Sequence, residues 1–290
     1  MIISGKTRIL GVIGNPIGHS LSPVMHNAAL DEMGSDFVYV AFPIEEAVLS
    51  TAIAGFGAIG VQGFNVTIPY KQTIMAELVH ISELAMAVGA VNTVWKTAQG
   101  WHGTNTDVEG FVSPLRAMNR DWSEQTVIVL GNGGAARAVV SGCGELGFKS
   151  IQVIGRDSNK LQDFLASFKN FESVASRLTA QTWDTLDNTI ANADLIVNST
   201  PIGMAPNINA SPLTTMQSQK IKSSAIAYDL IYTPNPTEFL KQAQAQGAIA
   251  IDGLEMLVQQ GAAGLKIWTR NSEVPVATMR VALQKYLGLV

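Results

Sequence analysis

A glycine-rich loop between an apolar run and a helical pattern most constrains the fold of this 290-residue sequence. Residues 126–130 (TVIVL) are apolar and mostly β-branched, residues 131–136 read GNGGAA, and a helical pattern then runs to Leu146 before Gly147. Glycines at such a turn let backbone N–H groups approach a pyrophosphate, and the start of the following helix adds a partial positive charge. A turn that serves packing alone is the other interpretation, but the flanking strand and helix favour a dinucleotide site.

The rest of the chain repeats this alternation of apolar strands and helical segments. We expect strands over residues 8–13, 37–42, 63–68, 126–130, 150–154, 194–198, 225–230 and 248–251. We expect helices over residues 22–33, 45–54 and 107–118, and an edge hairpin of residues 91–95 and 100–103. This alternation predicts mainly parallel sheets covered by helices. Residues 254–287 are helical in spacing with no strand ahead of them, which predicts that they fold back onto the first domain.

The length predicts two domains. The polar stretch over residues 119–125 is the expected linker. Residues 1–106, joined by helices in residues 254–290, form the first predicted domain, and residues 107–253 form the second. With 47% hydrophobic and 14% charged residues, the composition is typical of well-packed α/β proteins.

Charge and hydrophobic patterning exclude several kinds of partner. The formal net charge is −4 without a local cluster of Lys and Arg, which argues against nucleic acid. Apolar stretches end short of the roughly 18 residues that span a bilayer, so we expect no membrane association. The start of the chain lacks a signal-peptide pattern and Cys143 is the single cysteine, which together indicate the cytoplasm.

The residues after the second strand of the later domain bear on which dinucleotide binds. An NAD site usually places a carboxylate there for the ribose hydroxyls, whereas the 2′-phosphate of NADP requires arginine. Arg156 can bind a phosphate through two N–H groups, and Lys160 adds a second positive charge, although both also fit a solvated helix start. Asp157 fits either a helix N-cap or a ribose-binding carboxylate. We predict NADP.

Polar residues follow the early strands of the first domain. Ser20 and Ser22 precede a helix, and one of them can cap it, but two hydroxyls also suit a polyhydroxy or carboxylate ligand. Asn65 and Thr67 share one face of a strand. Lys71 is expected in the first turn of a helix, where the helix dipole disfavours a positive charge, so a functional role competes with a chance surface position.

Three further polar residues lie near predicted element ends. Asn92 is placed at the start of a strand, and Asp107 at a strand-to-helix junction, where it is also a good N-cap. Gln260 follows Gln259 in an otherwise apolar helix. An amide that points inward there needs partners, while solvent exposure explains at least one of the two more simply.

Six motifs taken together resemble the shikimate dehydrogenase family in order and spacing, over nearly the whole chain. They are SLSP (residues 20–23), NVTIPYK (65–71), AVNT (90–93), TNTD (104–107), the GNGGAA loop and DGLEMLVQQ (252–260). The resemblance implies a two-domain α/β fold with a mainly parallel substrate-binding sheet domain and a Rossmann-type doubly wound cofactor domain. It also implies reversible NADPH-dependent reduction of 3-dehydroshikimate to shikimate in chorismate and aromatic amino acid biosynthesis, by a monomer or homodimer.

The same resemblance assigns roles to individual residues. Lys71 and Asp107 would form the catalytic pair. The substrate-binding residues would be Ser20, Ser22, Asn65, Thr67, Lys71, Asn92, Asp107, Tyr228 and Gln260. The cofactor-binding residues would be Gly131, Asn132, Gly133, Gly134, Ala135, Arg156, Lys160, Thr200, Met204 and Gly253. Family members often carry Asn-Arg-Thr and a later Arg where this chain has Gly155, Asp157 and Lys160, a departure that concerns cofactor choice rather than reaction class.

Two other functions are compatible with the sequence. A quinate/shikimate dehydrogenase that uses NAD is the first, and Asp157 is the residue that supports it. A non-catalytic nucleotide-binding sensor on the same scaffold is the second, which the presence of both Lys71 and Asp107 disfavours. The four histidines lack the paired spacing of a metal site, and Cys143 fits packing better than nucleophilic chemistry.

Overall fold

The computed structural model describes residues 2–290, which divide into two units. Unit 1 comprises the chain up to Gly110 together with Val258–Val290, and unit 2 comprises Phe111–Leu257. The boundaries thus fall after residues 110 and 257, where the sequence placed them after 106 and 253. Helices α4 (Asp107–Ala117) and α11 (Gly253–Thr269) carry the chain across them.

The predicted linker over residues 119–125 is wrong, because this stretch lies inside unit 2. Trp122 in its centre is 4% exposed and stacks on Phe148, with ring centroids 5.0 Å apart. Burial of one large aromatic side chain ties a polar segment to the core.

Unit 1 is built on a six-stranded sheet of order β2-β1-β3-β5-β6-β4. Its strands are β1 (Arg8–Gly14), β2 (Phe37–Pro43), β3 (Gly63–Val66), β4 (His80–Ile81), β5 (Thr93–Thr97) and β6 (Gly100–Thr104). Its helices, besides the parts of α4 and α11, are α1 (Ser22–Glu32), η1 (Glu46–Val48), α2 (Leu49–Ile59), η2 (Thr73–Glu77), α3 (Glu83–Val88) and α12 (Val276–Tyr286). β1 is parallel to β2 and β3, whereas β5 is antiparallel to both β3 and β6.

This register gathers polar segments at one edge of the sheet. Asn65 near the end of β3 lies opposite Thr93 at the start of β5, and Thr93 in turn lies opposite Thr104 at the end of β6. Because β5 runs against its neighbours, its first residues meet their last ones. The carboxyl edge of β1 and β3 therefore also receives the segments around Asn92 and Asp107.

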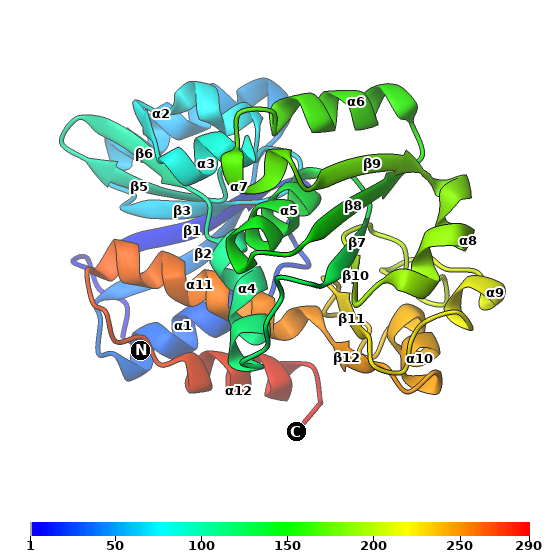
Figure 1. The fold of residues 1–290 in the computed structure, drawn as a ribbon. Coiled ribbons are helices and arrows are strands. Elements are labelled where there is room, and N and C mark those ends of the chain that lie inside the picture. Colours follow the sequence, from blue (N-terminus) through cyan, green and yellow to red (C-terminus); the bar gives the residue numbers. More distant parts are fainter. Residues whose placement is uncertain (1) are drawn as a thin grey trace. The chain divides into compact units, whose positions relative to one another are not determined.

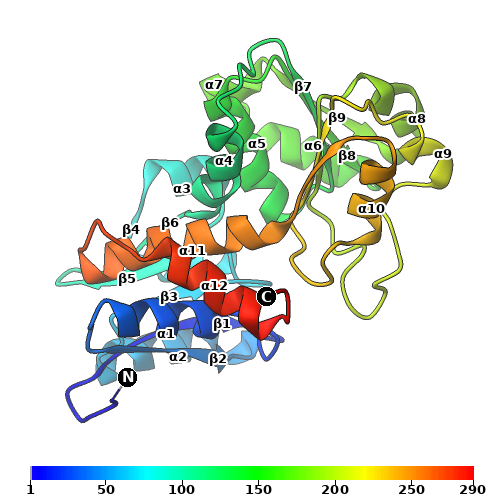
Figure 2. The same cartoon turned by 90° about the horizontal axis from the view of Figure 1, so that it is seen from below.

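Helices cover the faces of this sheet. α12 packs along α1, as Figure 2 shows with the red helix beside the blue one. α2 begins and ends later than the predicted helix over residues 45–54, because Ile53 and Phe56 are buried in the core and the helix stops only at Gly60, which has φ of +84°.

Three local predictions for unit 1 are wrong. β3 ends at Val66, and the following residues form a turn and then η2, so Lys71 is not in the first turn of an α-helix. No α-helix dipole therefore disfavours the positive charge of Lys71. The hairpin of β5 and β6 is not at the sheet edge, because the two-residue strand β4 pairs with β6. A strand this short leaves no periodic signal in a sequence.

Unit 2 is a doubly wound parallel sheet of order β12-β11-β10-β7-β8-β9, as predicted (Figure 1). Its strands are β7 (Thr126–Leu130), β8 (Ser150–Gly155), β9 (Leu178–Thr182), β10 (Leu195–Asn198), β11 (Ile226–Asp229) and β12 (Ile249–Ile251). Its helices are α5 (Gly134–Leu146), α6 (Ser158–Ser167), α7 (Glu172–Ala175), η3 (Trp183–Thr185), α8 (Leu186–Thr189), η4 (Ile190–Asn192), α9 (Thr215–Ser218) and α10 (Glu238–Ala245). The sequence missed β9, whose mixed polar residues occupy the sheet edge.

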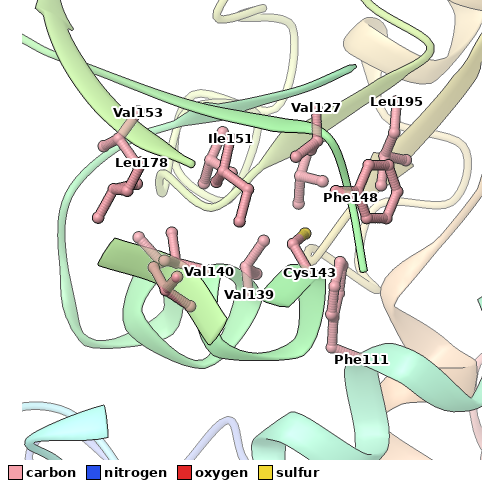
Figure 3. Close-up of a cluster of buried hydrophobic side chains, with 14 of the residues drawn as sticks. Phe111, Val127, Val139, Val140, Cys143, Phe148, Ile151, Val153, Leu178 and Leu195 are labelled. Carbon is pink, nitrogen blue, oxygen red and sulfur yellow. The ribbon is translucent and has the colours of Figure 1, made fainter. Parts of the chain in front are cut away.

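Helix α5 is held against β7 and β8 by a dry core. Figure 3 shows Val139, Val140 and Cys143 of α5 pointing toward Val127 and Ile151 of the sheet. All five side chains are fully buried, and complete burial of an aliphatic side chain stabilises the fold by about 1.5–3 kcal/mol. This packing fixes the position of α5 against the sheet, and the glycine loop leads into the start of this helix. Within residues 2–290, no helix has the length and apolar character needed to cross a membrane.

Candidate active site

The glycine loop of unit 2 lies at the carboxyl end of β7, the strand on whose two sides β8 and β10 pair. Ligands of open parallel sheets bind at this kind of switch point. Gly131 has φ of +103°, and a Cβ there would lie 2.9 Å from both Ser199 Oγ and Thr200 Cγ2. Gly133 and Gly134, by contrast, face open space at the start of α5. The glycine loop is therefore packed against the residues that follow β10, whereas the space at the N-terminus of α5 is free. A pyrophosphate fits in this space.

The other predicted residues of this loop are partly buried. Asn132 and Ala135 flank the glycines, and Ala136 is fully buried against the sheet. The helix ends at Gly147 with φ of +84°, so both ends of the predicted helix are confirmed.

Arg156 and Lys160 at the end of β8 are exposed. Between them, the Asp157 carboxylate accepts hydrogen bonds from the backbone N–H groups of Asn159 (2.9 Å) and Lys160 (3.2 Å) and so caps α6. The sequence allowed Asp157 to be either a helix N-cap or a ribose-binding carboxylate, and in the structure it is the N-cap of α6. The two cations remain accessible to a phosphate group.

Of the three remaining predicted cofactor residues, Thr200 and Met204 follow β10 and Gly253 follows β12. Thr200 donates from Oγ1 to Asn198 Oδ1 (2.7 Å), and Met204 is 38% exposed in the turn that follows. Gly253 starts α11, where a Cβ would overlap the carbonyl oxygen of Leu230. Glycine is therefore needed at residue 253 for close backbone packing.

Lys71 and Asp107 of unit 1 form an ion pair. Lys71 Nζ lies 2.6 Å from Asp107 Oδ2, and the two side chains are 19% and 9% exposed. The backbone of Lys71 is held as well, because its carbonyl oxygen accepts a hydrogen bond of 2.7 Å from Val91 N. Asp107, which the sequence also allowed as an N-cap, instead directs its carboxylate to side chains.

Asn92 connects this ion pair to its surroundings. Its Nδ2 donates to Asp107 Oδ1 (2.7 Å) and approaches Gln260 Oε1 (3.4 Å), while its Oδ1 accepts from Thr106 N (2.7 Å). Asn92 is 2% exposed and Gln260 is 8% exposed. The buried amide therefore fixes the orientation of the Asp107 carboxylate.

Asn65 is hydrogen-bonded to the residues next to this cluster. Its Oδ1 accepts from Tyr39 Oη (2.6 Å), and its Nδ2 donates to Asn92 O (3.1 Å) and Thr93 Oγ1 (3.0 Å). Tyr39 stacks on His26 with ring centroids 4.0 Å apart, and burial lowers the pKa of His26 to about 4. The stack of Tyr39 on a neutral His26 thus supports the side chain of Asn65.

Ser20, Ser22 and Thr67 lie near the carboxyl ends of β1 and β3. Ser20 Oγ accepts from Ser22 N (3.3 Å), and the N-cap position of α1 is Leu21, which makes no side-chain cap. Thr67 N donates to Ile13 O (3.0 Å), which continues the pairing of β3 with β1. Unit 1 therefore brings its predicted substrate residues to one edge of the sheet.

Tyr228, which the resemblance assigned to the substrate site, lies in the hydrophobic core. It is fully buried in the core of unit 2, stacks on Phe111 at 5.2 Å, and its hydroxyl has no partner among residues 2–290. Burial also raises its pKa well above the ordinary range. Tyr232, four residues later in the loop after β11, is partly exposed. Tyr232 is not among the residues predicted from the sequence, although its position just after a strand end is a usable signal.

Comparison with known proteins covers the chain from end to end. Residues 12–94 match the shikimate dehydrogenase substrate binding domain, residues 115–257 match the shikimate/quinate 5-dehydrogenase family, and residues 253–284 match the shikimate 5′-dehydrogenase C-terminal domain. A shikimate dehydrogenase (NADP⁺) from Trichormus variabilis is 56% identical over 290 residues, which is 100% of both chains.

Two solved structures are similar as well. A shikimate dehydrogenase in complex with NADP⁺ has a TM-score of 0.90 and 35% identity, covering 99% of this chain and 98% of that one. The enzyme from Thermus thermophilus, in complex with NADP(H) and shikimate, has a TM-score of 0.85 and 32% identity, covering 96% and 99%. On this sequence identity and coverage, the chain belongs to the shikimate dehydrogenase family.

Proposed function

We propose that this chain catalyses the reversible NADPH-dependent reduction of 3-dehydroshikimate to shikimate, in the biosynthesis of chorismate and aromatic amino acids. The observation that carries the proposal is the Lys71–Asp107 ion pair, oriented by Asn92, in a chain that also has a dinucleotide loop. The names of its relatives, including the T. thermophilus enzyme bound to NADP(H) and shikimate, support both substrate and cofactor.

Unit 1 binds the substrate in this proposal. The substrate carries hydroxyl groups and a carboxylate, which require hydroxyl, amide and cationic partners. Unit 1 offers these groups at one sheet edge, from Ser20, Ser22, Asn65, Thr67, Lys71, Asn92, Asp107 and Gln260. The amide of Asn65 already makes hydrogen bonds with Tyr39, Asn92 and Thr93. Its main contribution is therefore to hold these neighbouring residues in place.

Lys71 is the proton donor of the proposed reaction. Reduction of a ketone needs a hydride at carbon, which NADPH supplies when bound, and a proton at oxygen. The Lys71 ammonium stabilises the developing alkoxide and donates that proton, and the Asp107 carboxylate holds the ammonium in position. With 19% of its side chain exposed, Lys71 can regain a proton from solvent.

Unit 2 binds the cofactor. The N–H groups around Gly133 and Gly134 hold the pyrophosphate, and Arg156 with Lys160 holds the 2′-phosphate. Asp157 caps α6 through Oδ1, which gives this carboxylate a role other than binding the ribose hydroxyls of NAD and so favours NADP. Met204, Thr200 and Gly253 belong to the same side of the unit, near the ends of β10 and β11.

A spectrophotometric assay that offers shikimate and quinate with NADP⁺ and NAD⁺ tests this function. We expect fastest turnover with shikimate and NADP⁺. Preferred turnover with NAD⁺, of quinate or of shikimate, would establish the NAD-using quinate/shikimate dehydrogenase instead. Binding of NADP⁺ without turnover of either acid would establish the sensor.

We further propose that the enzyme works in the cytoplasm as a monomer or homodimer. The lone cysteine is buried, and burial raises its pKa well above the ordinary value, so it stays an unreactive thiol. Light scattering coupled to size-exclusion chromatography measures the oligomeric state, and fractionation of cells measures the compartment.

A further inference from the structure

Asp229 is a buried carboxylate at the end of β11 that the proposed reaction does not use. Its exposed fraction is 0%. Oδ1 accepts hydrogen bonds of 3.0 Å from both Asn198 Nδ2 and Ile231 N, and Oδ2 accepts one of 2.7 Å from Thr237 Oγ1. Burial raises the pKa of Asp229 to about 6. Burial of a carboxylate costs free energy, and three hydrogen-bond donors point at this one. We therefore expect Asp229 to hold the groups around it in position.

The first consequence of Asp229 is the orientation of the Asn198 amide. An ionised carboxylate can only accept, so Asn198 must turn its NH₂ group toward Asp229 and its oxygen away. That oxygen then accepts hydrogen bonds from Thr200 N (3.1 Å) and Thr200 Oγ1 (2.7 Å). The NH₂ group also donates to Ile202 O (3.1 Å). The charge on Asp229 therefore sets the conformation of the loop over residues 199–203.

The second consequence is the anchoring of the loop after β11. Thr237 is the N-cap of α10, where its hydroxyl accepts from Leu240 N (3.3 Å) while donating to Asp229. Together with the bond from Ile231 N, this contact ties both ends of the segment over residues 231–237 to one carboxylate. Asp229 thus joins two loops at the carboxyl edge of the sheet.

The loop that contains Thr200 abuts the glycine loop. Ser199 Oγ donates to Leu130 O (2.7 Å), and a Cβ at Gly131 would meet both Ser199 and Thr200. β8, which ends directly before Arg156, lies on one side of β7, and β10 lies on the other. With the pyrophosphate at the β7 loop and the adenosine 2′-phosphate toward β8, the nicotinamide half of the cofactor extends toward β10 and Thr200.

We propose that Asp229 is a positioning residue for the nicotinamide half of the cofactor. It acts through Asn198 on the Thr200 loop and does not itself touch the ligand. This inference rests on the proposed function, since it requires a dinucleotide in unit 2. It predicts that loss of the charge weakens binding of one half of the cofactor and leaves the other half unaffected.

Calorimetric titration of the Asp229→Asn variant, without substrate, tests this directly. The probes are NADP⁺ and adenosine 2′,5′-bisphosphate, which has the 2′-phosphate but no nicotinamide. We expect the Kd of NADP⁺ to rise about 10-fold, as for loss of one charge-assisted hydrogen bond, and the Kd of adenosine 2′,5′-bisphosphate to stay within about 2-fold. In the assay, kcat should fall while the KM of shikimate is unchanged. Equal weakening of both ligands, or weakening of neither, overturns the proposal.

A second variant and a control secure the result. Asn198→Ala should give the same split between the two ligands, which keeps the test valid if Asp229→Asn does not fold. The double variant should bind NADP⁺ no more weakly than Asn198→Ala, because the two residues act in series. If the losses of NADP⁺ affinity in the two single variants add up in the double variant, Asp229 does not act through Asn198. Ser141→Ala, which removes a buried hydroxyl without a partner among residues 2–290, should leave both affinities unchanged.

The same titrations separate this inference from the proposed function. If the unmodified protein does not bind NADP⁺, the proposed function fails. If it binds NADP⁺ and Asp229→Asn binds it equally well, only the inference about Asp229 fails.

Discussion

Lys71 Nζ donates a 2.6 Å hydrogen bond to Asp107 Oδ2, across 36 positions of the chain. The other carboxylate oxygen accepts from Asn92, so both oxygens of Asp107 are engaged and its orientation is set. A partly buried ion pair of this kind holds its ammonium in one place. Removal of either partner leaves the other without compensation in a poorly solvated site.

Replacement of Lys71 by alanine should lower kcat by about 10²- to 10⁴-fold, the usual contribution of a general acid. Unfolding by urea should remain cooperative, since 19% of the Lys71 side chain is already exposed. Lys266→Ala, at an exposed position of α11, is the matched control and should retain wild-type kcat. A near-normal kcat for Lys71→Ala would show that another group donates the proton.

Gly131→Ala should destabilise the fold by about 1–3 kcal/mol, the range for a residue held in a disfavoured backbone conformation. Its φ of +103° and the contacts with Ser199 and Thr200 leave no room for a Cβ. Gly133→Ala, at φ of −85° and facing open space, should unfold like the wild type yet bind NADP⁺ more weakly. Urea unfolding and calorimetry measure the two effects, and equal stability of both variants would refute the steric argument.

Arg156→Ala should weaken NADP⁺ binding by about 10- to 100-fold, the loss expected for charge-assisted hydrogen bonds to phosphate, without changing the Kd of NAD⁺. Asp157→Ala should cost about 1 kcal/mol of stability through loss of the α6 cap, with no change in cofactor preference. A drop in NAD⁺ affinity on Asp157→Ala would instead assign Asp157 to the ribose.

Tyr232→Phe should raise the KM of shikimate about 5- to 15-fold, the value of one lost hydrogen bond. Tyr232 is partly exposed after the end of β11, where ligands of parallel sheets bind. Tyr228→Phe should leave this KM unchanged and preserve or increase stability, because its buried hydroxyl has no partner among residues 2–290. Steady-state kinetics of the two variants decide between them, and the opposite pattern would restore Tyr228 as the substrate ligand.

The pH dependence of stability should reveal Asp229. Its folded pKa, about 6, is raised from 3.8, so the fold favours the protonated form. Relative to Asp229→Asn, the wild type should be most stable below about pH 4 and should lose about 3 kcal/mol as the pH rises to about 6. Urea unfolding of both proteins from pH 4 to 7 gives this difference, in which other titrating groups cancel. A constant difference across that range is incompatible with a buried, titrating Asp229.

Local sequence pattern was sufficient for the elements of unit 2 that matter most to the proposed cofactor site. The run over residues 126–147 encodes strand, turn and helix within one continuous stretch, and the structure confirms α5 from Gly134 to its terminator Gly147. The positive φ angles of Gly131 and Gly147 are local backbone requirements for glycine, so the glycine spacing can be read from the chain, whereas the contacts of Gly131 with Ser199 and Thr200 are not local. The alternation of apolar strands and helices likewise predicted the doubly wound sheet.

Contacts between distant segments could not be read in the same way. The edge strands β4 and β9 have no periodic pattern, Trp122 draws a supposed linker into the core, and Lys71 occupies a turn. The predicted return of the C-terminal residues to the first domain is confirmed, because Val258–Val290 belongs to unit 1. The resemblance selected Asn92, Asp107 and Gln260, but their hydrogen bonds also depend on an antiparallel β5 inserted among parallel strands. Register and helix docking depend on burial summed over many remote side chains, which no window of neighbouring residues contains.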